Sequence, residues 1–377
     1  MKTNQIEKTE LETKLNIKIV RSLEDIRNLS SDWDDLFKRA DNANPYYSRA
    51  WIQTFISEAK NNGAPILITA WSDSKLVALL PLTIKNYFGI KAAIGTPSSV
   101  LCCTGMLVDS QYQSAIRLIA ETCARDKIAH IFYNKLTSSW DESTNNFFDE
   151  LFHHGFVNRR WKRHVCLKAQ LESDFDQLLR KTRNKKQRQK LLYHEKQIFK
   201  SDDVVLKRYD GMQITTEIVK RIGDIQNNSW VKIEEEAYLV KPLYQKLLFE
   251  LGQSDIGSAW VLSNKEEDIA FLYSLRVRDN LYIKWMSYKQ KYGSSTLSFG
   301  KALYTQVIRE ACKEGVNIVD FGFGEDKWKH HWASDKENIY MIISGQGVIG
   351  RIAVIFFSML KKCARYKWLL TNRLKQA

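Results

Sequence analysis

Hydrophobic and polar positions along the chain define five short runs that are rich in β-branched, aliphatic and aromatic residues, a composition typical of strands. These runs are residues 64–71, 75–85, 258–263, 269–277 and 281–288. A polar turn at Ser72-Asp73-Ser74 joins the first two, and a turn containing Asp279-Asn280 joins the last two. Asp-Asn between two such runs favours a tight hairpin. We therefore predict a strand–turn–strand unit in each half of the chain.

Each half then continues with a helical pattern and a further apolar run. The predicted helices are 111–126 and 299–314, and the strands predicted after them are 129–134 and 316–321. In the second helix apolar residues recur every three or four positions, and Gly315 follows as a stop signal. The chain is therefore expected to hold two copies of a mixed α/β unit of about 150 residues each.

The pattern divides the chain into four parts. We predict a polar N-terminal tail (1–16), a first unit (17–170), a second unit (171–345) and a basic C-terminal helix (346–377). Near the boundary, a strand ends at "HVCLKAQL" and a Ser-Asp pair opens a helix. No low-complexity linker lies there, so the two units are expected to pack together.

Composition favours a cytoplasmic protein without a metal. The first 16 residues contain no apolar segment of the kind found in signal peptides. The six cysteines form no C-x-x-C pair, which is typical of reduced thiols. The seven histidines have no spacing that suits a metal site, so we expect none.

The formal net charge of +14 comes from two local segments. Residues 180–190 and residues 346–377 each carry seven basic side chains and no acidic one, which together equal the whole excess. The first segment is predicted to be a helix that meets phosphates of a nucleotide-sugar, a lipid-linked sugar or a tRNA, or that is simply solvated.

The second basic segment also has an apolar side. Six apolar residues fall near one helical face, namely Ile352, Ile355, Phe356, Met359, Tyr366 and Leu370. The apolar stretch of nine residues, 352–360, is interrupted only by Ser358 and is far shorter than the ~20 needed to span a bilayer. We predict a helix that lies on an anionic membrane surface, the alternative being a helix docked on the second unit.

The segment 316–333 contains Asp320-Phe321-Gly322, a tripeptide that holds magnesium in protein kinases. Kinases also need a glycine-rich loop and an H-R-D sequence upstream, and neither is present. Only 56 residues follow Phe321, too few for the rest of a kinase. The tripeptide therefore belongs to another kind of site.

A loop of glycine and hydroxyl residues follows the run 281–288 and leads into the helix that begins near Gly300, with Lys301 in its first turn. Unpaired backbone N–H groups at a helix N-terminus bind phosphate readily. The spacing is neither that of a P-loop nor that of a dinucleotide fingerprint, and an ordinary capped helix is the alternative.

These stretches resemble the GNAT superfamily, and specifically the CelD-type acetyltransferases of bacterial polysaccharide synthesis, relatives of the FemAB aminoacyl transferases. The resemblance runs from residue 44 to residue 333 and includes the basic segment 180–190. Its most specific parts are Ser298-Phe299-Gly300, Asp320-Phe321-Gly322 and Trp328-Lys329. The family tends to read Ser-Pro-Gly, Asp-Phe-Gly and Tyr-Lys, so Phe299 and Trp328 depart from its pattern.

The resemblance implies a mixed α/β (α+β) fold of tandem GNAT-like domains, each with a mostly antiparallel sheet flanked by helices. Acyl-CoA, in the first instance acetyl-CoA, would lie between the splayed strands 281–288 and 316–321, with its pyrophosphate at the helix N-terminus. The residues expected to bind it are Met286, Ser287, Ser298, Phe299, Gly300 and Lys301.

The resemblance and the residue types also suggest catalytic roles. Asp320 would take the proton of the acceptor, Tyr288 would protonate the departing thiolate, and Lys329 would bind a phosphate or the carbonyl oxygen. The structural alternatives are an Asp320 that caps a helical segment at 325–332 or pairs with Lys327 or Lys329, a packed Tyr288 and a solvated Lys329. Trp230, Tyr238 and Trp328 are expected to line the acceptor cleft. The first unit lacks the aspartate and the glycines, so it would shape this cleft without binding CoA.

The sequence thus predicts an acyltransferase acting on an amine or hydroxyl of a saccharide or polysaccharide precursor, such as a nucleotide- or lipid-linked sugar. A FemAB-like aminoacyl transferase that uses charged tRNA and a non-catalytic scaffold of a polysaccharide-synthesis complex remain alternatives. A nucleic-acid-binding protein would need a recognition motif, and the sequence has none. The expected location is the cytoplasm, with peripheral contact at the inner face of the membrane.

Overall fold

The computed structural model describes residues 14–57, 63–97, 102–200, 203–229, 237–293 and 298–359. Its strands are β1 (Leu15–Val20), β2 (Ala64–Ser72), β3 (Lys75–Tyr87), β4 (Ile90–Gly95), β5 (Leu107–Val108), β6 (Ile131–Ser138), β7 (Val157–Gln170), β8 (Val205–Asp210), β9 (Gly257–Ser263), β10 (Asp268–Val277), β11 (Asn280–Tyr288), β12 (Ile318–Phe323) and β13 (Asp335–Gly345). They form one sheet in the order β1-β2-β3-β4-β6-β13-β7-β12-β11-β10-β9-β8, with β5 beside β3. Apart from the parallel pairs β4–β6 and β11–β12, its neighbours are antiparallel.

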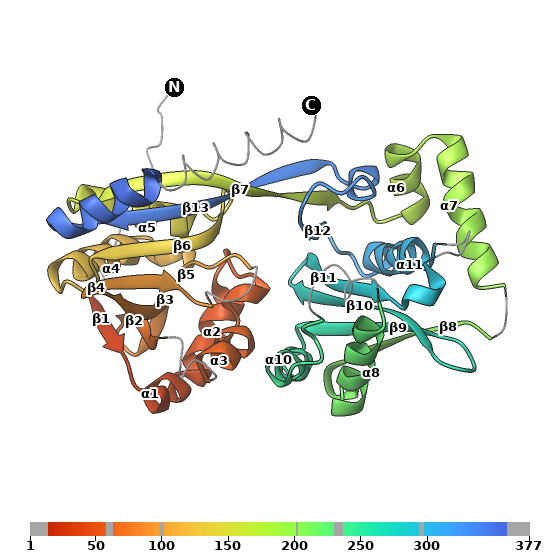
Figure 1. Ribbon diagram of the computed structural model, residues 1–377, viewed down its shortest axis with the longest axis horizontal. Helices are drawn as coiled ribbons and strands as arrows, with labels where there is room; N and C mark the ends of the chain where they lie inside the picture. The colour runs from red at the N-terminus through yellow and green to blue at the C-terminus, as the bar shows by residue number, and fades with distance from the viewer. Residues whose placement is uncertain are drawn as a thin grey trace, which may run out of the picture.

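Helices cover this sheet in two lobes (Figure 1). The α-helices are α1 (Leu23–Asn28), α2 (Ser30–Arg39), α3 (Arg49–Ser57), α4 (Ser114–Arg125), α5 (Glu142–His153), α6 (Phe175–Thr182), α7 (Lys185–Ile198), α8 (Thr216–Asn227), α10 (Pro242–Gln253) and α11 (Phe299–Lys313). A further helix covers residues 347–359. One lobe holds β1 to β6 with α1 to α5, and the other holds β8 to β12 with α6 to α11. This arrangement confirms the predicted mixed α/β fold with a mostly antiparallel sheet.

The two lobes exchange strands. Strand β7 follows the first lobe in sequence, yet its C-terminal end pairs with β12 of the second lobe. Strand β13 follows the second lobe, yet it lies between β6 and β7 and pairs with both. In Figure 1 these two long strands cross the top of the molecule and join the lobes. The predicted boundary near residue 170 stays a prediction, but the sheet itself is continuous there.

Most of the predicted elements are present. The hairpin β2–β3 and the consecutive strands β9, β10 and β11 confirm the two strand–turn–strand units. The predicted helix 299–314 is α11, and Gly315 follows it with a φ of 69°, a backbone conformation that glycine adopts without strain.

Two helix predictions need correction. The basic segment is not one helix, because the chain bends at Arg183 and Asn184 begins α7 with a capping box involving Gln187. The segment 325–332 is not a helix either, because only a 3₁₀ turn, η6 (Lys329–His331), forms within it.

The parallel strands β11 and β12 stay together for only a short distance. Their ladder pairs Asn280 to Tyr282 with Ile318 to Asp320 and ends there. Beyond it, Gly322 and Gly324 adopt φ values of 70° and 99° as the chain leaves β12. The strands therefore diverge, as the family resemblance implied, and side chains of both line a cavity beyond this point.

Candidate active site

The N-terminus of α11 lies close to β11. Ser298 caps the helix, and its Oγ accepts a hydrogen bond from the backbone N–H of Lys301 at 3.4 Å. A Cβ placed on Gly300 would lie 3.3 Å from Met286 Cε and 3.7 Å from the Tyr288 ring. The glycine therefore allows the start of the helix to approach the strand.

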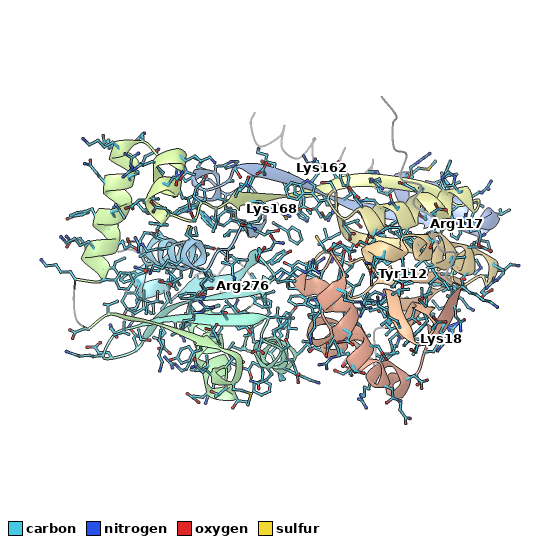
Figure 2. The ribbon with its side chains drawn as sticks, turned by 180° about the vertical axis from the view of Figure 1, so that it is seen from behind. Lys18, Tyr112, Arg117, Lys162, Lys168 and Arg276 are labelled. Atoms are coloured by element: carbon cyan, nitrogen blue, oxygen red, sulfur yellow. The ribbon has the colours of Figure 1, made fainter. Side chains whose placement is uncertain are left out.

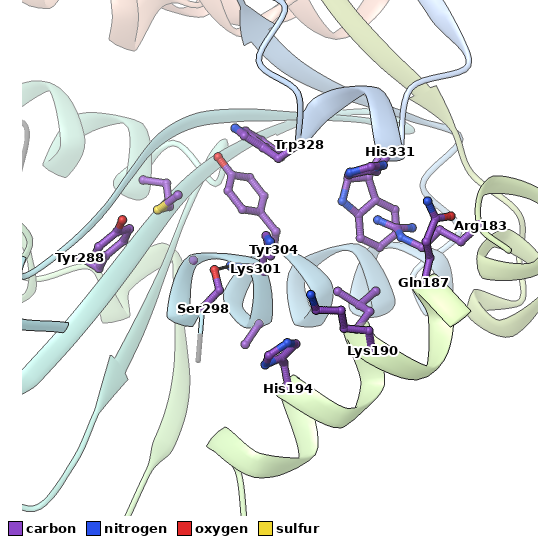
Figure 3. Close-up of a pocket in the computed structure, with 15 residues that line it drawn as sticks. Arg183, Gln187, Lys190, His194, Tyr288, Ser298, Lys301, Tyr304, Trp328 and His331 are labelled. Carbon is purple, nitrogen blue, oxygen red and sulfur yellow. Dashed lines mark hydrogen bonds between the residues drawn. The ribbon is translucent and has the colours of Figure 1, made fainter. Parts of the chain in front are cut away.

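A cavity of about 480 Å³ opens beside this helix end, and we call it the donor cavity. Helix α7 forms the wall opposite α11 (Figure 3). Five of its lining side chains are basic, namely Arg183, Lys190, His194, Lys301 and His331. No carboxylate is among its lining residues in the described part of the chain. Positive side chains at the positive end of a helix dipole favour binding of a polyanion.

Burial and the repulsion between neighbouring positive charges lower the pKa values of basic groups in this cavity. The guanidinium carbon of Arg183 lies 3.6 Å from the centroid of the Trp332 ring, and burial lowers the Arg183 pKa to about 10. Partial burial, followed by the charges of Arg183 and Lys301, lowers the pKa of His331. A bound anion would relieve this repulsion.

A second cavity, of about 560 Å³, lies between the diverging ends of β11 and β12, and we call it the acceptor cavity. Both lobes and the exchanged strand β7 contribute to it, through residues such as Tyr46, Cys103 and Cys166. Eight aromatic side chains line it, namely Tyr46, Tyr238, Tyr244, Trp285, Tyr304, Phe321, Phe323 and Trp328. Three carboxyl groups, those of Asp320, Asp326 and Glu337, and two lysines, Lys284 and Lys329, add charge.

Asp320 points into this cavity from β12. Its Oδ1 accepts a hydrogen bond from the backbone N–H of Gly322 at 2.7 Å, and its Oδ2 lies 3.7 Å from Lys168 Nζ. The ion-pair partner is thus Lys168 of the exchanged strand, and not Lys327 or Lys329. Figure 2 shows Lys168 beneath the β7–β13 strand pair, toward the middle of the molecule.

Lys168 joins two carboxyl groups. Its Nζ also lies 2.5 Å from Glu337 Oε2. Glu337 belongs to β13 and Asp320 to β12, the two strands that flank β7 in the sheet. Burial opposes its charge, but Asp320 and Glu337 together raise the Lys168 pKa. Burial also raises the pKa of Glu337. The ion pairs of Lys168 with Asp320 and Glu337 hold one wall of the acceptor cavity in a fixed arrangement.

Lys329 is not a solvated helix residue. It is 5% exposed, and its Nζ donates a hydrogen bond to the carbonyl oxygen of Phe323 at 2.6 Å and lies 3.2 Å from Asp326 Oδ2. These contacts hold the ammonium at the exit of β12, within the lining of the acceptor cavity.

The two cavities share a wall. Met286, Tyr304 and Trp328 line both of them. The rings of Tyr304 and Trp328 lie with centroids 4.2 Å apart (Figure 3). A donor molecule in one cavity and an acceptor in the other would therefore meet at this ring pair.

Lys284 is a candidate that sequence reasoning missed. Its Nζ lies 4.9 Å from the Tyr46 ring, 5.3 Å from the Trp51 ring and 5.6 Å from the Trp285 ring. Burial among these rings lowers the Lys284 pKa. The available signal was a lone charged residue, this lysine, in the strand "LYIKWMSY".

The other predicted residues separate into two groups. Tyr288, like Lys301, lines the donor cavity, whereas Tyr238 lines the acceptor cavity. Ser287 is fully buried, and Phe299 packs on Tyr292 with ring centroids 5.3 Å apart, so neither side chain lines a cavity. For these two residues only a backbone role remains as a prediction.

The tryptophans also differ from one another. Trp328 lines both cavities, whereas Trp332 is 4% exposed, packs beside Phe175 and lines the donor cavity but not the acceptor cavity. Trp230 lies outside the described residues. Within those residues, no group of three or more His, Cys, Asp or Glu side chains is placed to hold a metal ion.

Comparisons with known proteins agree with this architecture. Residues 185–330 match the family described as "Acetyltransferase (GNAT) domain". A search of curated proteins found no match. The crystal structure of FemX superimposes with a TM-score of 0.59 at 10% identity, over 86% of this chain and 96% of that chain. The C-terminal domain of a putative lysylphosphatidylglycerol synthetase from Agrobacterium fabrum superimposes with a TM-score of 0.53 at 11% identity, over 90% of this chain and 97% of that chain.

The family match includes α7, β11, α11 and β12, and so covers both walls of the donor cavity and the strand that carries Asp320. At these identities the structural matches establish the fold alone. Residues 185–330 are therefore similar to a GNAT-type acetyltransferase domain, and they lie in a two-lobed sheet of the fold seen in FemX.

Proposed function

We propose that this protein transfers an acyl group from acyl-CoA to an amine or hydroxyl of a saccharide precursor. One observation carries the proposal: a basic cavity at a helix N-terminus shares a wall with an aromatic cavity that contains a carboxylate. The first suits a polyphosphate donor and the second suits an uncharged or weakly charged acceptor.

On the donor side, Arg183, Lys190 and Lys301 would hold the phosphates of CoA. The thioester would then lie near Met286 and the Tyr304–Trp328 ring pair, where the two cavities meet. Backbone N–H groups of β11 beyond Tyr282, which lack a ladder to β12, are the candidates for stabilising the oxyanion.

On the acceptor side, the aromatic side chains offer flat apolar faces that suit the C–H faces of a sugar ring. The acceptor N–H or O–H would give its proton to Asp320 or to Lys284 as its N or O bonds to the acyl carbon. The C–S bond then breaks, and the thiolate takes a proton from the Tyr304 hydroxyl. Tyr304 is a better candidate than Tyr288 because it lines both cavities.

A FemAB-like reaction with charged tRNA is the second candidate. The basic α7 favours it, because Lys185 and Lys186 are exposed and Arg188 is half-buried, all three outside the donor cavity. The CelD-type assignment, the role in polysaccharide synthesis and a cytoplasmic location are further parts of our proposal, motivated by the sequence motifs.

A thermal-shift screen with acetyl-CoA, longer acyl-CoAs and free CoA tests the proposal directly. A ligand that binds only the folded state stabilises it, by about 2.7 kcal/mol when its free concentration is a hundred times Kd. The melting temperature rises as a result. We expect stabilisation by acyl-CoA, which Lys301→Ala weakens and which Lys196→Ala, an exposed change on α7, leaves intact.

Two results would redirect the proposal. Acyl transfer that needs charged tRNA, with no stabilisation by any CoA species, would establish the aminoacyl reaction instead. The double variant Asp320→Asn with Lys329→Ala should abolish an enzymatic function in cells. If function in cells stays intact, the protein acts as a scaffold.

A further inference from the structure

The helix 347–359 exposes a continuous apolar stripe. Six of its side chains are between 50% and 76% exposed, namely Val348, Ile349, Ile352, Ile355, Phe356 and Met359. They recur at intervals of one, three and four residues, so they lie along one side of the helix. Single exposed apolar side chains are ordinary, whereas six on one helix face mark an interaction surface.

The opposite side of this helix is fixed to the sheet. Val354 is fully buried, and the Phe357 ring lies 5.9 Å from Tyr133 of β6 and 6.1 Å from Trp161 of β7, centroid to centroid. Arg351 also donates a hydrogen bond to the carbonyl oxygen of Gly155 at 3.2 Å. The stripe therefore belongs to the folded domain and is held outward by these contacts.

The surroundings of the stripe are basic. Arg159 of β7 is exposed two residues before Trp161 and so lies on the strand face that the helix covers. Burial raises the pKa of Tyr133, and the exposed Arg163 lies near enough for its charge to oppose that rise. In sequence, the segment after the helix adds six basic residues and no acidic one, namely Lys361, Lys362, Arg365, Lys367, Arg373 and Lys375.

We propose that the helix 347–359 docks on an anionic phospholipid surface, with its apolar stripe in the headgroup region and the surrounding bases on the lipid phosphates. No helix in the described ranges is long and apolar enough to cross a bilayer. An apolar stripe flanked by cations is typical of a helix that lies in the interface. A second copy of the chain would bring the same cations together and be repelled.

Vesicle flotation of the full chain tests this. Vesicles of phosphatidylcholine mixed with phosphatidylglycerol are compared with vesicles of phosphatidylcholine alone, at low and at high salt. We expect binding to the anionic vesicles that weakens as salt is added. Ile352→Glu combined with Phe356→Glu should reduce the bound fraction about tenfold or more, because both side chains are 60% exposed and would enter the lipid.

The matched control is Met212→Glu, which adds a charge at another highly exposed apolar side chain, 80% exposed in the second lobe. It should bind vesicles as the unchanged protein does. Melting temperatures of all variants check that the fold is intact, which is expected because none of these side chains is buried.

Three outcomes would overturn the proposal. The first is equal binding by the Ile352–Phe356 double variant and the unchanged protein, and the second is no preference for anionic vesicles. The third is a dimer in solution that the double variant converts to a monomer, because the stripe would then be an interface between copies of this chain.

Discussion

Tyr304 of α11 and Trp328, which follows β12, lie with ring centroids 4.2 Å apart and an interplanar angle of 36°. The pair stands where the basic donor cavity meets the aromatic acceptor cavity. Since burial raises the pKa of Tyr304, its hydroxyl keeps its proton at neutral pH. The ring pair can therefore close the path between two ligands and also hold a proton at their meeting point.

Tyr304→Phe tests the hydroxyl alone, because it keeps the ring against Trp328. Proton transfer by a positioned side chain contributes roughly 10²–10⁴-fold. We expect acyl transfer in a single turnover to slow by about a hundredfold, while stabilisation by acyl-CoA stays the same. Tyr288→Phe is the control and should have a small effect; the reverse order of effects would return the acid role to Tyr288.

Lys190→Ala and Lys301→Ala remove cations from opposite walls of the donor cavity. Each should weaken acyl-CoA binding about tenfold, or about 1.4 kcal/mol, and should reduce its dependence on salt. Isothermal titration at several salt concentrations measures both quantities. Lys196→Ala changes an exposed lysine of the same helix outside the cavity, and affinity lost there as well would point to a general charge effect.

The lowered pKa of Lys284 predicts how the rate of acyl transfer depends on pH. Burial lowers its pKa below the ordinary 10.5, so its neutral amine forms at lower pH than that of a solvated lysine. If Lys284 accepts the acceptor's proton, transfer rises with pH through this lowered pKa and then levels off. Lys284→Met should remove that limb of the rate profile, and a limb that survives would leave Asp320 as the base.

The same shift has a consequence for stability. Between the lowered pKa and 10.5, the unfolded chain binds a proton at Lys284 that the folded chain does not. The free energy of unfolding therefore rises with pH across this window, and the destabilising effect is fully present below it. Urea unfolding of the unchanged protein and of Lys284→Met should show a difference that shrinks as pH rises.

Glu195→Gln tests how α7 is held beside the donor cavity. Glu195 is 7% exposed and makes two hydrogen bonds to Arg309 of α11, at 2.6 and 2.7 Å. Removing its charge leaves Arg309 without a counter-ion, and since the Arg309 side chain is 23% exposed we expect a loss of about 2 kcal/mol in unfolding free energy. The control Glu310→Gln breaks the exposed pair with Lys313 on α11 and should cost at most about 0.5 kcal/mol.

Local sequence signals predicted the elements around the site well. The strands β9 to β11, the helix α11 and the exit at Gly322 follow from alternation, helical spacing and glycine, all of which act over a few residues. The donor cavity was also partly predicted. Residues 298–301 form a local motif, and the seven basic side chains of residues 180–190 are visible in the sequence.

The acceptor side could not be foreseen in the same way. Lys168 reaches Asp320 only because β7 crosses into the second lobe, and no local pattern encodes that pairing. Tyr46 and Cys103 enter the cavity from distant parts of the chain. Lys284 gains its altered pKa from rings of both lobes, so its role depends on tertiary packing that the sequence does not display.

The exchange of β7 and β13 between the lobes affects how the chain folds and whether it can be cut into stable fragments. Each lobe completes its sheet with a strand that the other supplies, so a fragment ending between the lobes would carry an unpaired edge prone to aggregation. Such long-range pairings slow folding, since the C-terminal strand must be synthesised before the first lobe is finished. We therefore expect that neither lobe folds as an independent module, because each would lose a strand of its sheet.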